Sequence, residues 1–409
     1  MKQFKFIDLF CGIGGFHQAL SSLGGECVFA SDIDKSCRES YEVNYGIKAH
    51  GDITAIAASD IPQFDVLCAG FPCQSFSKAG NRKGIDDARG TLFFDILRIA
   101  KEHKPKYMLL ENVRNLASHD NGRTWKVIRD NLRDIGYSVP HNPVIFSPHQ
   151  VGIPQHRERV FIMCRRKDLG DAVDFIFKPD GEGVCRVDSI LDTKGAHLKP
   201  YMLSKSEIEL INIWNEFIQN IKAPLPGFPV WADRLKELDP CEDLDSLPKW
   251  KSNFIIKNSL LYEKNKVFLD KWLPKARKLD LFKGSKAMLE WQVGKIENPD
   301  LWENIMQFRP SGLRVKKPTY LPALVAITQT SIVGTHKRYL TPRECARMQS
   351  FPESFKLHEK DRQAYKQFGN SVNVKLVRMF ADLLMNDSFD PSEYGLIVDS
   401  EKVLKPPID

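Results

Sequence analysis

Short apolar runs alternate with helical patterns over the first 165 residues. Five runs read as buried strands, because they are brief, rich in Val, Ile, Leu and Phe, and separated by segments long enough for a crossover. They are KFIDLF (5–10), ECVFASD (26–32), DVLCAG (65–70), YMLLENV (107–113) and RVFIMC (159–164). Apolar residues recur at helical spacing over 91–103 and 124–135. This alternation predicts a doubly wound α/β sheet in which all five strands are parallel.

The pattern changes after Arg166. From residue 167 to about 335 the periodicity is irregular, and six of the seven tryptophans lie there, which predicts a folded domain rather than a linker. We expect most of these rings to pack in a core: Trp214, Trp231, Trp250, Trp272, Trp291 and Trp302. Helical patterns return in TPRECARMQ and VNVKLVRMFADLLM. We therefore predict a first domain over 1–166, an inserted domain over 167–335, and a return segment over 336–409 that completes the first.

Composition narrows the class of protein only a little. An apolar content of 42% is ordinary for a globular chain of 409 residues, and the net charge of +7 allows nucleic acid as a partner but equally fits a solvated surface. The sequence has no signal peptide pattern and no run long enough for a membrane span, so we expect a cytoplasmic protein. Nine cysteines without a C-x-x-C pair indicate neither a disulfide framework nor a zinc site, and most are expected to be reduced and buried.

A glycine-rich turn follows the first strand, in DLFCGIGGF (8–16). Glycines at the carboxyl end of a strand let the backbone approach a ligand closely, and doubly wound sheets bind nucleotides at that edge. A plain strand-to-helix turn has the same pattern. His17 occupies the place of the third glycine of a dinucleotide fingerprint, so a pyrophosphate ligand is disfavoured.

Two further strand ends carry an acid beside an isoleucine. Asp32 can accept both ribose hydroxyls while Ile33 packs on a purine, and Asp52 can accept from an exocyclic amine while Ile53 covers the other ring face. Each acid alone is more often a helix cap or turn residue. Three successive strand ends with suitable groups predict an adenosine site, and S-adenosylmethionine fits a nucleoside without phosphates.

The remaining candidates are one thiol, one acid and two arginines. Cys73 follows the third strand in a polar, glycine-punctuated loop, where a thiolate can attack an electron-poor carbon; the alternative is an inert buried thiol. Glu111, at the next strand end, can protonate a ring nitrogen, or it only caps a helix. By strand alternation Arg157 and Arg159 share a face and can clamp a carbonyl oxygen and phosphates, or they form a surface ion-pair face.

With GFPCQSFS (70–77), ENV (111–113), QHRERVF (155–161) and FGNSV (368–372) in this order, the chain resembles the DNA cytosine-5 methyltransferases of prokaryotic restriction–modification systems. The resemblance covers roughly 5–166 and 338–385. It implies a Rossmann-like, S-adenosylmethionine-dependent catalytic domain, with the tryptophan-rich insertion as a smaller target-recognition domain.

The resemblance also implies residue roles in catalysis. Cys73 adds to C6 of a flipped-out cytosine, Glu111 engages N3 and the exocyclic amine, Arg159 holds O2, and Arg157 supports it. C5 then takes the methyl group, S-adenosylhomocysteine is the product, and loss of the C5 proton with elimination of Cys73 gives 5-methylcytosine.

Binding residues are implied in the same way. Those expected around the cofactor are Phe10, Ile13, Gly14, Gly15, Asp32, Ile33, Asp52, Ile53, Pro72, Leu92, Asn370 and Ser371. Those expected to meet DNA are Ser77, Lys78, Arg82, Lys83 and Arg89 of a closing loop, and Thr319, Thr328 and Thr330, with Ser331, of the insertion. No metal is expected.

Three other functions compete with this one. A tRNA cytosine-5 methyltransferase of the same fold shares the catalytic motifs, but the long insertion favours reading of duplex DNA. A catalytically silent DNA-binding relative would not need Cys73, Glu111 and Arg159 together. A nicotinamide oxidoreductase disagrees with the glycine spacing. We therefore predict a monomeric DNA methyltransferase whose partner is double-stranded DNA, with a separately acting restriction endonuclease as its companion.

Overall fold

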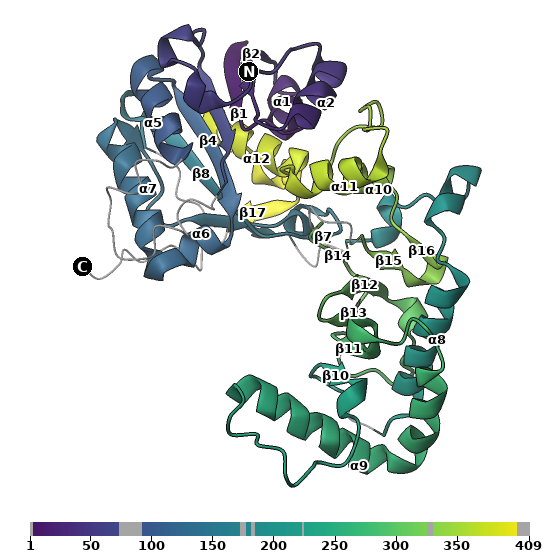
Figure 1. Ribbon diagram of the computed structural model, residues 1–409. Coiled ribbons are helices and arrows are strands. Elements are labelled where there is room, and N and C mark those ends of the chain that lie inside the picture. The colour runs from purple at the N-terminus through teal and green to yellow at the C-terminus, as the bar shows by residue number, and fades with distance from the viewer. Residues whose placement is uncertain are drawn as a thin grey trace. The chain divides into compact units, whose positions relative to one another are not determined.

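The computed structural model describes residues 3–72, 92–171, 177–180, 185–222, 225–324 and 330–398. The chain divides into two compact units (Figure 1). Unit 1 consists of residues 1–186, 322–327 and 345–409, and unit 2 consists of residues 187–321 and 328–344. The functional division drawn from the sequence, with a target-recognition domain over 167–335, stays a prediction.

A mixed sheet forms the centre of unit 1, in the order β2-β1-β3-β4-β8-β5, with β6 also paired to β8. The first four strands along the chain pair in parallel, which confirms the α/β class. The strands are β1 Phe4–Leu9, β2 Gly25–Ser31, β3 Val66–Gly70, β4 Tyr107–Val113, β5 Tyr137–Ser138, β6 Val144–Phe146 and β8 Arg159–Arg166.

The predicted direction of the last strand is wrong. β8 runs antiparallel to β4, and β5 and β6 also pair with it antiparallel. Residues 160–164 are buried, so the strand is apolar on both faces whichever way it runs. The hydrophobic pattern therefore identified the strand and carried no information on its direction.

Helices cover both faces of this sheet. Figure 1 shows α5 and α7 against one face and α1 and α12 against the other. The predicted helices over 91–103 and 124–135 are confirmed as α5 and α7, and the C-terminal one as α12. Bounds are α1 Gly15–Ser21, α2 Lys35–Tyr45, α5 Leu92–His103, α6 Asn115–Ser118, α7 Arg123–Asp134, α10 Pro342–Met348, α11 Asp361–Asn370 and α12 Val374–Met385.

Four further short strands are β7, β9, β14 and β17. β9 and β17 pair antiparallel, which joins the segment after the sheet to the end of the described chain. The bounds are β7 Gln155–His156, β9 Phe177–Pro179, β14 Leu321–Pro322 and β17 Leu396–Val398. Residues 345–409 belong to unit 1 and residues 328–344 to unit 2, whereas the return segment was predicted over 336–409; that it completes the first domain stays a prediction.

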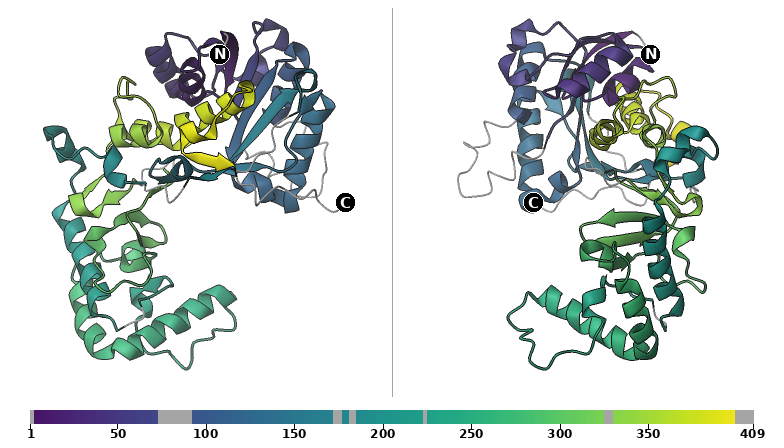
Figure 2. Two further views of the ribbon diagram at one scale, coloured as in Figure 1. Left: turned by 180° about the vertical axis from the view of Figure 1, so that it is seen from behind. Right: turned by 45° about the vertical axis from the view of Figure 1, so that its right-hand side comes forward.

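Unit 2 has its own sheet and core. The sheet order is β10-β11-β13-β12-β15-β16. Trp214, Trp272 and Trp291 are buried in one apolar cluster, as expected, whereas Trp250 is 57% exposed. Figure 2 gives two further views in which the long helix α9 can be followed. Bounds are α8 Lys205–Asn220, β10 Val230–Trp231, α9 Lys249–Arg277, β11 Met288–Trp291, β12 Ile305–Arg309, β13 Gly312–Lys316, β15 Ile332–Val333 and β16 Arg338–Tyr339.

Candidate active site

The turn after β1 has an uncommon backbone. Phe10 has a φ of 56°, Gly12 of 52° and Gly14 of 83°, so a non-glycine residue adopts the left-handed region at the strand end. Such a conformation persists only where the surroundings enforce it, and it is concentrated at binding sites. Here it brings the Phe10 side chain into the wall of a cavity.

Asp32 holds this turn from the neighbouring strand end. One carboxylate oxygen accepts from the Gly12 N–H at 2.8 Å, and the other accepts from the Asp34 N–H at 2.7 Å. Burial raises the pKa of Asp32, and these two donors oppose the rise. Each oxygen keeps a second lone pair, so the carboxylate is positioned to accept from a vicinal diol.

Replacing Asp32 by asparagine is expected to weaken S-adenosylhomocysteine binding by about 10- to 100-fold, because a charge-assisted hydrogen bond is lost and an NH₂ group faces a backbone N–H. Isothermal titration of the purified variant measures the change. The matched control is Asp60→Asn, an exposed carboxylate outside the cavity, which is expected to bind as the wild type does. Equal affinity in the Asp32 variant would contradict the role.

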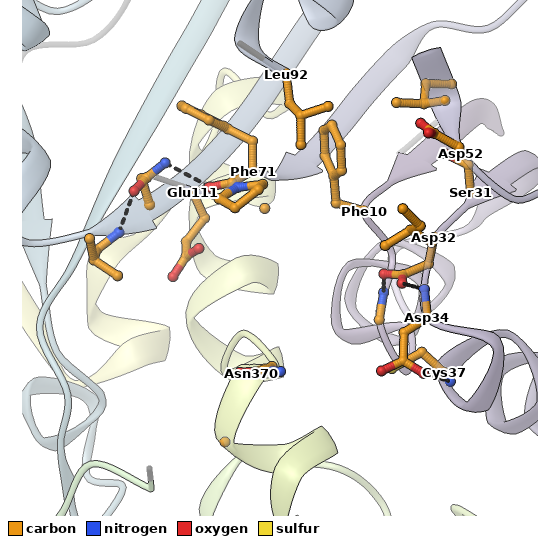
Figure 3. Close-up of a pocket in the computed structure, with 18 of the residues that line it drawn as sticks. Phe10, Ser31, Asp32, Asp34, Cys37, Asp52, Phe71, Leu92, Glu111 and Asn370 are labelled. Atoms are coloured by element: carbon orange, nitrogen blue, oxygen red, sulfur yellow. Dashed lines mark hydrogen bonds between the residues drawn. The ribbon is translucent and has the colours of Figure 1, made fainter. Parts of the chain in front are cut away.

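The cavity encloses about 740 Å³, a size suited to a nucleoside derivative. Strand ends of β1, β2, β3 and β4 and the end of α11 contribute to its wall. In Figure 3, Asp32 and Asp52 lie toward one side and Glu111 toward the other, with Phe10 and Leu92 between them. The predicted site residues that line it are Phe10, Asp32, Ile33, Asp52, Ile53, Pro72, Leu92, Glu111, Arg157, Arg159 and Asn370.

The side of the cavity predicted to hold a purine is apolar and accessible. Ile33 is 76% exposed although it comes only two residues after the buried end of β2, so its side chain is available to a flat ring. Asp52 uses one oxygen, Oδ1, to accept from the backbone N–H and the hydroxyl of Thr54. It is therefore a cap residue as well as a candidate ligand, and both interpretations of this acid coexist.

Four of the predicted cofactor residues are not part of the cavity wall: Ile13, Gly14, Gly15 and Ser371. Ile13 is buried, and a Cβ on Gly14 would lie 2.2 Å from the Tyr45 ring. A Cβ on Gly15 would lie 2.6 Å from the Val372 side chain and 3.0 Å from Ser371 Oγ. Gly15 thus allows α1 to contact the FGNSV segment closely, and Gly14 leaves room for the Tyr45 ring, which gives both glycines a packing reason.

The two groups predicted to face the base are paired. Arg159 Nε donates to Glu111 Oε1 at 2.9 Å. The antiparallel pairing of β4 and β8 places Val113 opposite Arg159, and Glu111, two residues from Val113, lies on the same face of the sheet as Arg159. Glu111 is 8% exposed. Burial raises its pKa, and the positive charges of Arg159 and then Arg157 oppose the rise. The arrangement combines a carboxyl group of raised pKa with a cation at one edge of the cavity.

Asn112 was not among the predicted site residues, but its contacts give it a role. Its amide donates to the Phe71 carbonyl at 2.8 Å, and its side-chain oxygen accepts from the Val113 N–H at 2.8 Å. Asn112 therefore fixes the main chain at Phe71, which comes two residues before Cys73 in the sequence. The signal available in the sequence was an amide directly after the predicted acid Glu111 at a strand end.

Replacing Asn112 by alanine is expected to lower kcat by about 10- to 100-fold, because a small displacement of a nucleophile has effects of that order. The KM for S-adenosylmethionine is expected to change little. Single-turnover methylation separates the chemical step from binding. Asn115→Ala, an exposed asparagine in α6, is the matched control; a loss of equal size there would contradict the assignment.

Arg157 and Arg159 both line the cavity, but their side chains make different contacts. It is 5% exposed and precedes β8, and its guanidinium donates to the carbonyls of Leu324, Gly369 and Ser371. Burial lowers its pKa to about 9, and the nearby charge of Arg159 adds to this effect.

The predicted nucleophile and closing loop lie outside the described residues. This holds for Cys73, Ser77, Lys78, Arg82, Lys83 and Arg89, and for Thr328 of the insertion. Their roles stay predictions.

Polar side chains lie in one row across the sheet of unit 2, on neighbouring strands. Arg314 Nε donates to Glu290 Oε2 at 2.6 Å, and Gln307 donates to Ser331 Oγ at 3.2 Å. Thr319 is exposed, and Thr330 is partly buried. Arg314 and Gln307 were not among the predicted site residues.

In the described ranges, no group of three or more His, Cys, Asp or Glu side chains is arranged to hold a metal ion. None of the helices described here is long and apolar enough to span a membrane.

Known proteins resemble this chain over most of its length. The type II methyltransferase M.AluI of Cellulosimicrobium cellulans is 36% identical, with 92% of this chain and 91% of that protein covered. The type II methyltransferase M.HhaI of Haemophilus parahaemolyticus is 35% identical, with 92% and 93% covered.

Solved structures support the fold. The Dnmt2 methyltransferase of S. pombe matches with a TM-score of 0.51 at 22% identity, over 93% of this chain and 98% of that one. A putative DNA modification methyltransferase encoded within an E. coli prophage matches with a TM-score of 0.52 at 20% identity, over 93% and 97%. The family model of the C-5 cytosine-specific DNA methylases matches residues 4–386. The chain belongs to the C-5 cytosine-specific DNA methylase family.

Proposed function

We propose that the protein transfers a methyl group from S-adenosylmethionine to C5 of cytosine in double-stranded DNA. The observation that carries the proposal is the Glu111–Arg159 pair, 2.9 Å apart, in a cavity whose wall also contains Asp32 and Asp52. A proton donor beside a cation matches the adjacent N3 and O2 of cytosine. The similarity to type II methyltransferases gives the proposal its substrate class.

The residues of the cavity fit the cofactor. Asp32 has lone pairs free for the ribose hydroxyls, and Ile33, 76% exposed, offers an apolar surface to the adenine. Phe10 and Asn370 contribute to the wall between the nucleoside side and Glu111. When bound, S-adenosylmethionine supplies an electrophilic methyl group.

The proposed steps begin with Cys73. Its thiolate adds to C6 while Glu111 holds a proton at N3 and Arg159 donates to O2, so the electron pair of the 5,6 double bond becomes available at C5. C5 takes the methyl group. A base then removes the C5 proton, the C6–S bond breaks, and the thiolate of Cys73 is restored.

The target base must leave the duplex for this chemistry, because C6 is inaccessible in a stacked helix. We assign closure over the flipped base to the loop 74–91 and sequence reading to the inserted domain. We further propose a cytoplasmic monomer that modifies DNA at sites cut by a separate restriction endonuclease.

Incubation of the purified protein with radiolabelled S-adenosylmethionine and either plasmid DNA or tRNA tests the function. We expect incorporation into plasmid DNA, and bisulfite sequencing of that DNA is expected to show one short recognition sequence. Incorporation only into tRNA would contradict the DNA assignment. Incorporation into neither substrate, with cofactor binding intact, would support a catalytically silent DNA-binding protein instead.

A further inference from the structure

Arg157 is a buried arginine whose side chain bonds to main-chain carbonyls. Its Nη1 donates to the Gly369 carbonyl at 2.9 Å and to the Leu324 carbonyl at 3.5 Å, and its Nη2 donates to the Ser371 carbonyl at 3.1 Å. Among the described residues, all its side-chain acceptors are main-chain oxygens. A buried guanidinium without a carboxylate contact is costly, so simple packing is a poor explanation for it.

The carbonyls that it binds flank a cavity residue. Gly369 and Ser371 lie 212 and 214 positions along the chain from Arg157, on either side of Asn370, which lines the cavity. The planar fork of an arginine presents two Nη atoms in a fixed geometry, so it can hold carbonyls from two separate nitrogens, whereas a lysine has a single nitrogen. Arg157 therefore fixes the end of α11.

Arg157 is itself held in place. Its backbone N–H donates to Ser147 Oγ at 2.9 Å, and this serine begins a short helical turn with a capping box closed by Gln150. Two residues later, Arg159 pairs with Glu111. The same short segment thus positions the residues proposed to hold the base and the chain that carries Asn370.

We propose that Arg157 is a positioning residue that fixes the Gly369–Ser371 segment, and with it the cofactor wall, relative to the Glu111–Arg159 pair. This inference rests on the proposed function, since it assigns the cavity to S-adenosylmethionine. Both Nη atoms donate to carbonyls, so we assign Arg157 an action through these contacts and assign the contact with the base to Arg159.

Two variants of Arg157 test this role. Arg157→Met removes all three carbonyl contacts and is expected to raise the dissociation constant of S-adenosylhomocysteine, measured by titration without DNA, by about 10- to 100-fold. The KM for S-adenosylmethionine is expected to rise by a larger factor than kcat falls. Arg157→Lys keeps the charge but has one nitrogen in place of the planar fork, so it is expected to restore binding in part.

The control is Arg166→Met at the last residue of β8, where the arginine pairs with Asp168 away from the cavity. It is expected to bind the cofactor product as the wild type does. Wild-type affinity in both folded Arg157 variants would overturn the inference, as would a fall in kcat alone. If Arg157→Met does not fold, wild-type affinity in Arg157→Lys overturns it. Failure of the wild type itself to bind S-adenosylhomocysteine would overturn the proposed function, and the inference with it.

Discussion

Replacing Cys73 by alanine is expected to lower methyl transfer to DNA by about 10⁴-fold or more, because without a nucleophile at C6 the pyrimidine C5 does not become reactive toward the methyl donor. Affinity for S-adenosylhomocysteine is expected to stay within about twofold of wild type, since the described wall of the cavity is built from other residues. Radiolabel incorporation and titration measure the two quantities separately.

A covalent trap gives the same prediction an independent readout. DNA that contains 5-fluorocytosine cannot lose a C5 proton, so the wild type is expected to stay attached to it and to migrate as a complex under denaturing conditions. Cys73→Ala is expected to give no complex. Cys241→Ala is the matched control, because that thiol is exposed in unit 2. Trapping by the Cys73 variant would contradict the mechanism.

Other cysteines show why the position of a thiol decides its chemistry. Cys68 lies within β3 and is fully buried, and burial raises its pKa well above its ordinary range. Such a thiol stays protonated and unreactive. Cys68 and Cys164 are fully buried, in agreement with the expectation that most of the cysteines are buried. Cys73, which follows the end of β3 in the sequence, stays the predicted nucleophile.

The layered fold of unit 1 was predictable because its signals are local. Buried strands such as β3 and β4 are short apolar runs, and α5 and α12 carry apolar residues at helical spacing. The direction of β8 was not predictable, since it depends on how the chain between α7 and β8 folds back. Its two short strands, β5 and β6, leave little pattern in the sequence.

The sequence predicted which strand ends contribute residues to the candidate site, but it predicted fewer of the contacts between those residues. Asp32 and Glu111 both line the cavity, as the sequence suggested. The prediction that Arg157 and Arg159 share a face assumed a strand through both, but β8 begins at Arg159. The contacts of Arg157 lie more than 200 positions away, and no local pattern encodes such a pairing.

Replacing Glu111 by glutamine is expected to lower the single-turnover rate by about 10²- to 10⁴-fold, the range that general acid catalysis contributes. Glutamine keeps the shape and one hydrogen bond but has no acidic proton for N3. Asp95→Asn, a carboxylate of α5 that pairs with Arg98, is the control for loss of a charge and is expected to keep the wild-type rate.

The pH dependence follows from the direction of the Glu111 pKa. Burial raises this pKa, so the carboxyl keeps its proton to higher pH than an exposed glutamate, and the wild-type rate is expected to fall as pH rises through the raised value. Arg159 lowers the pKa, so in Arg159→Leu the fall is expected at higher pH although the maximal rate is smaller. Glu111→Gln has no titrating group at this position and is expected to lose that limb of the profile. An unchanged alkaline limb in Glu111→Gln would show that another group supplies the proton, and Arg159→Leu would then shift nothing.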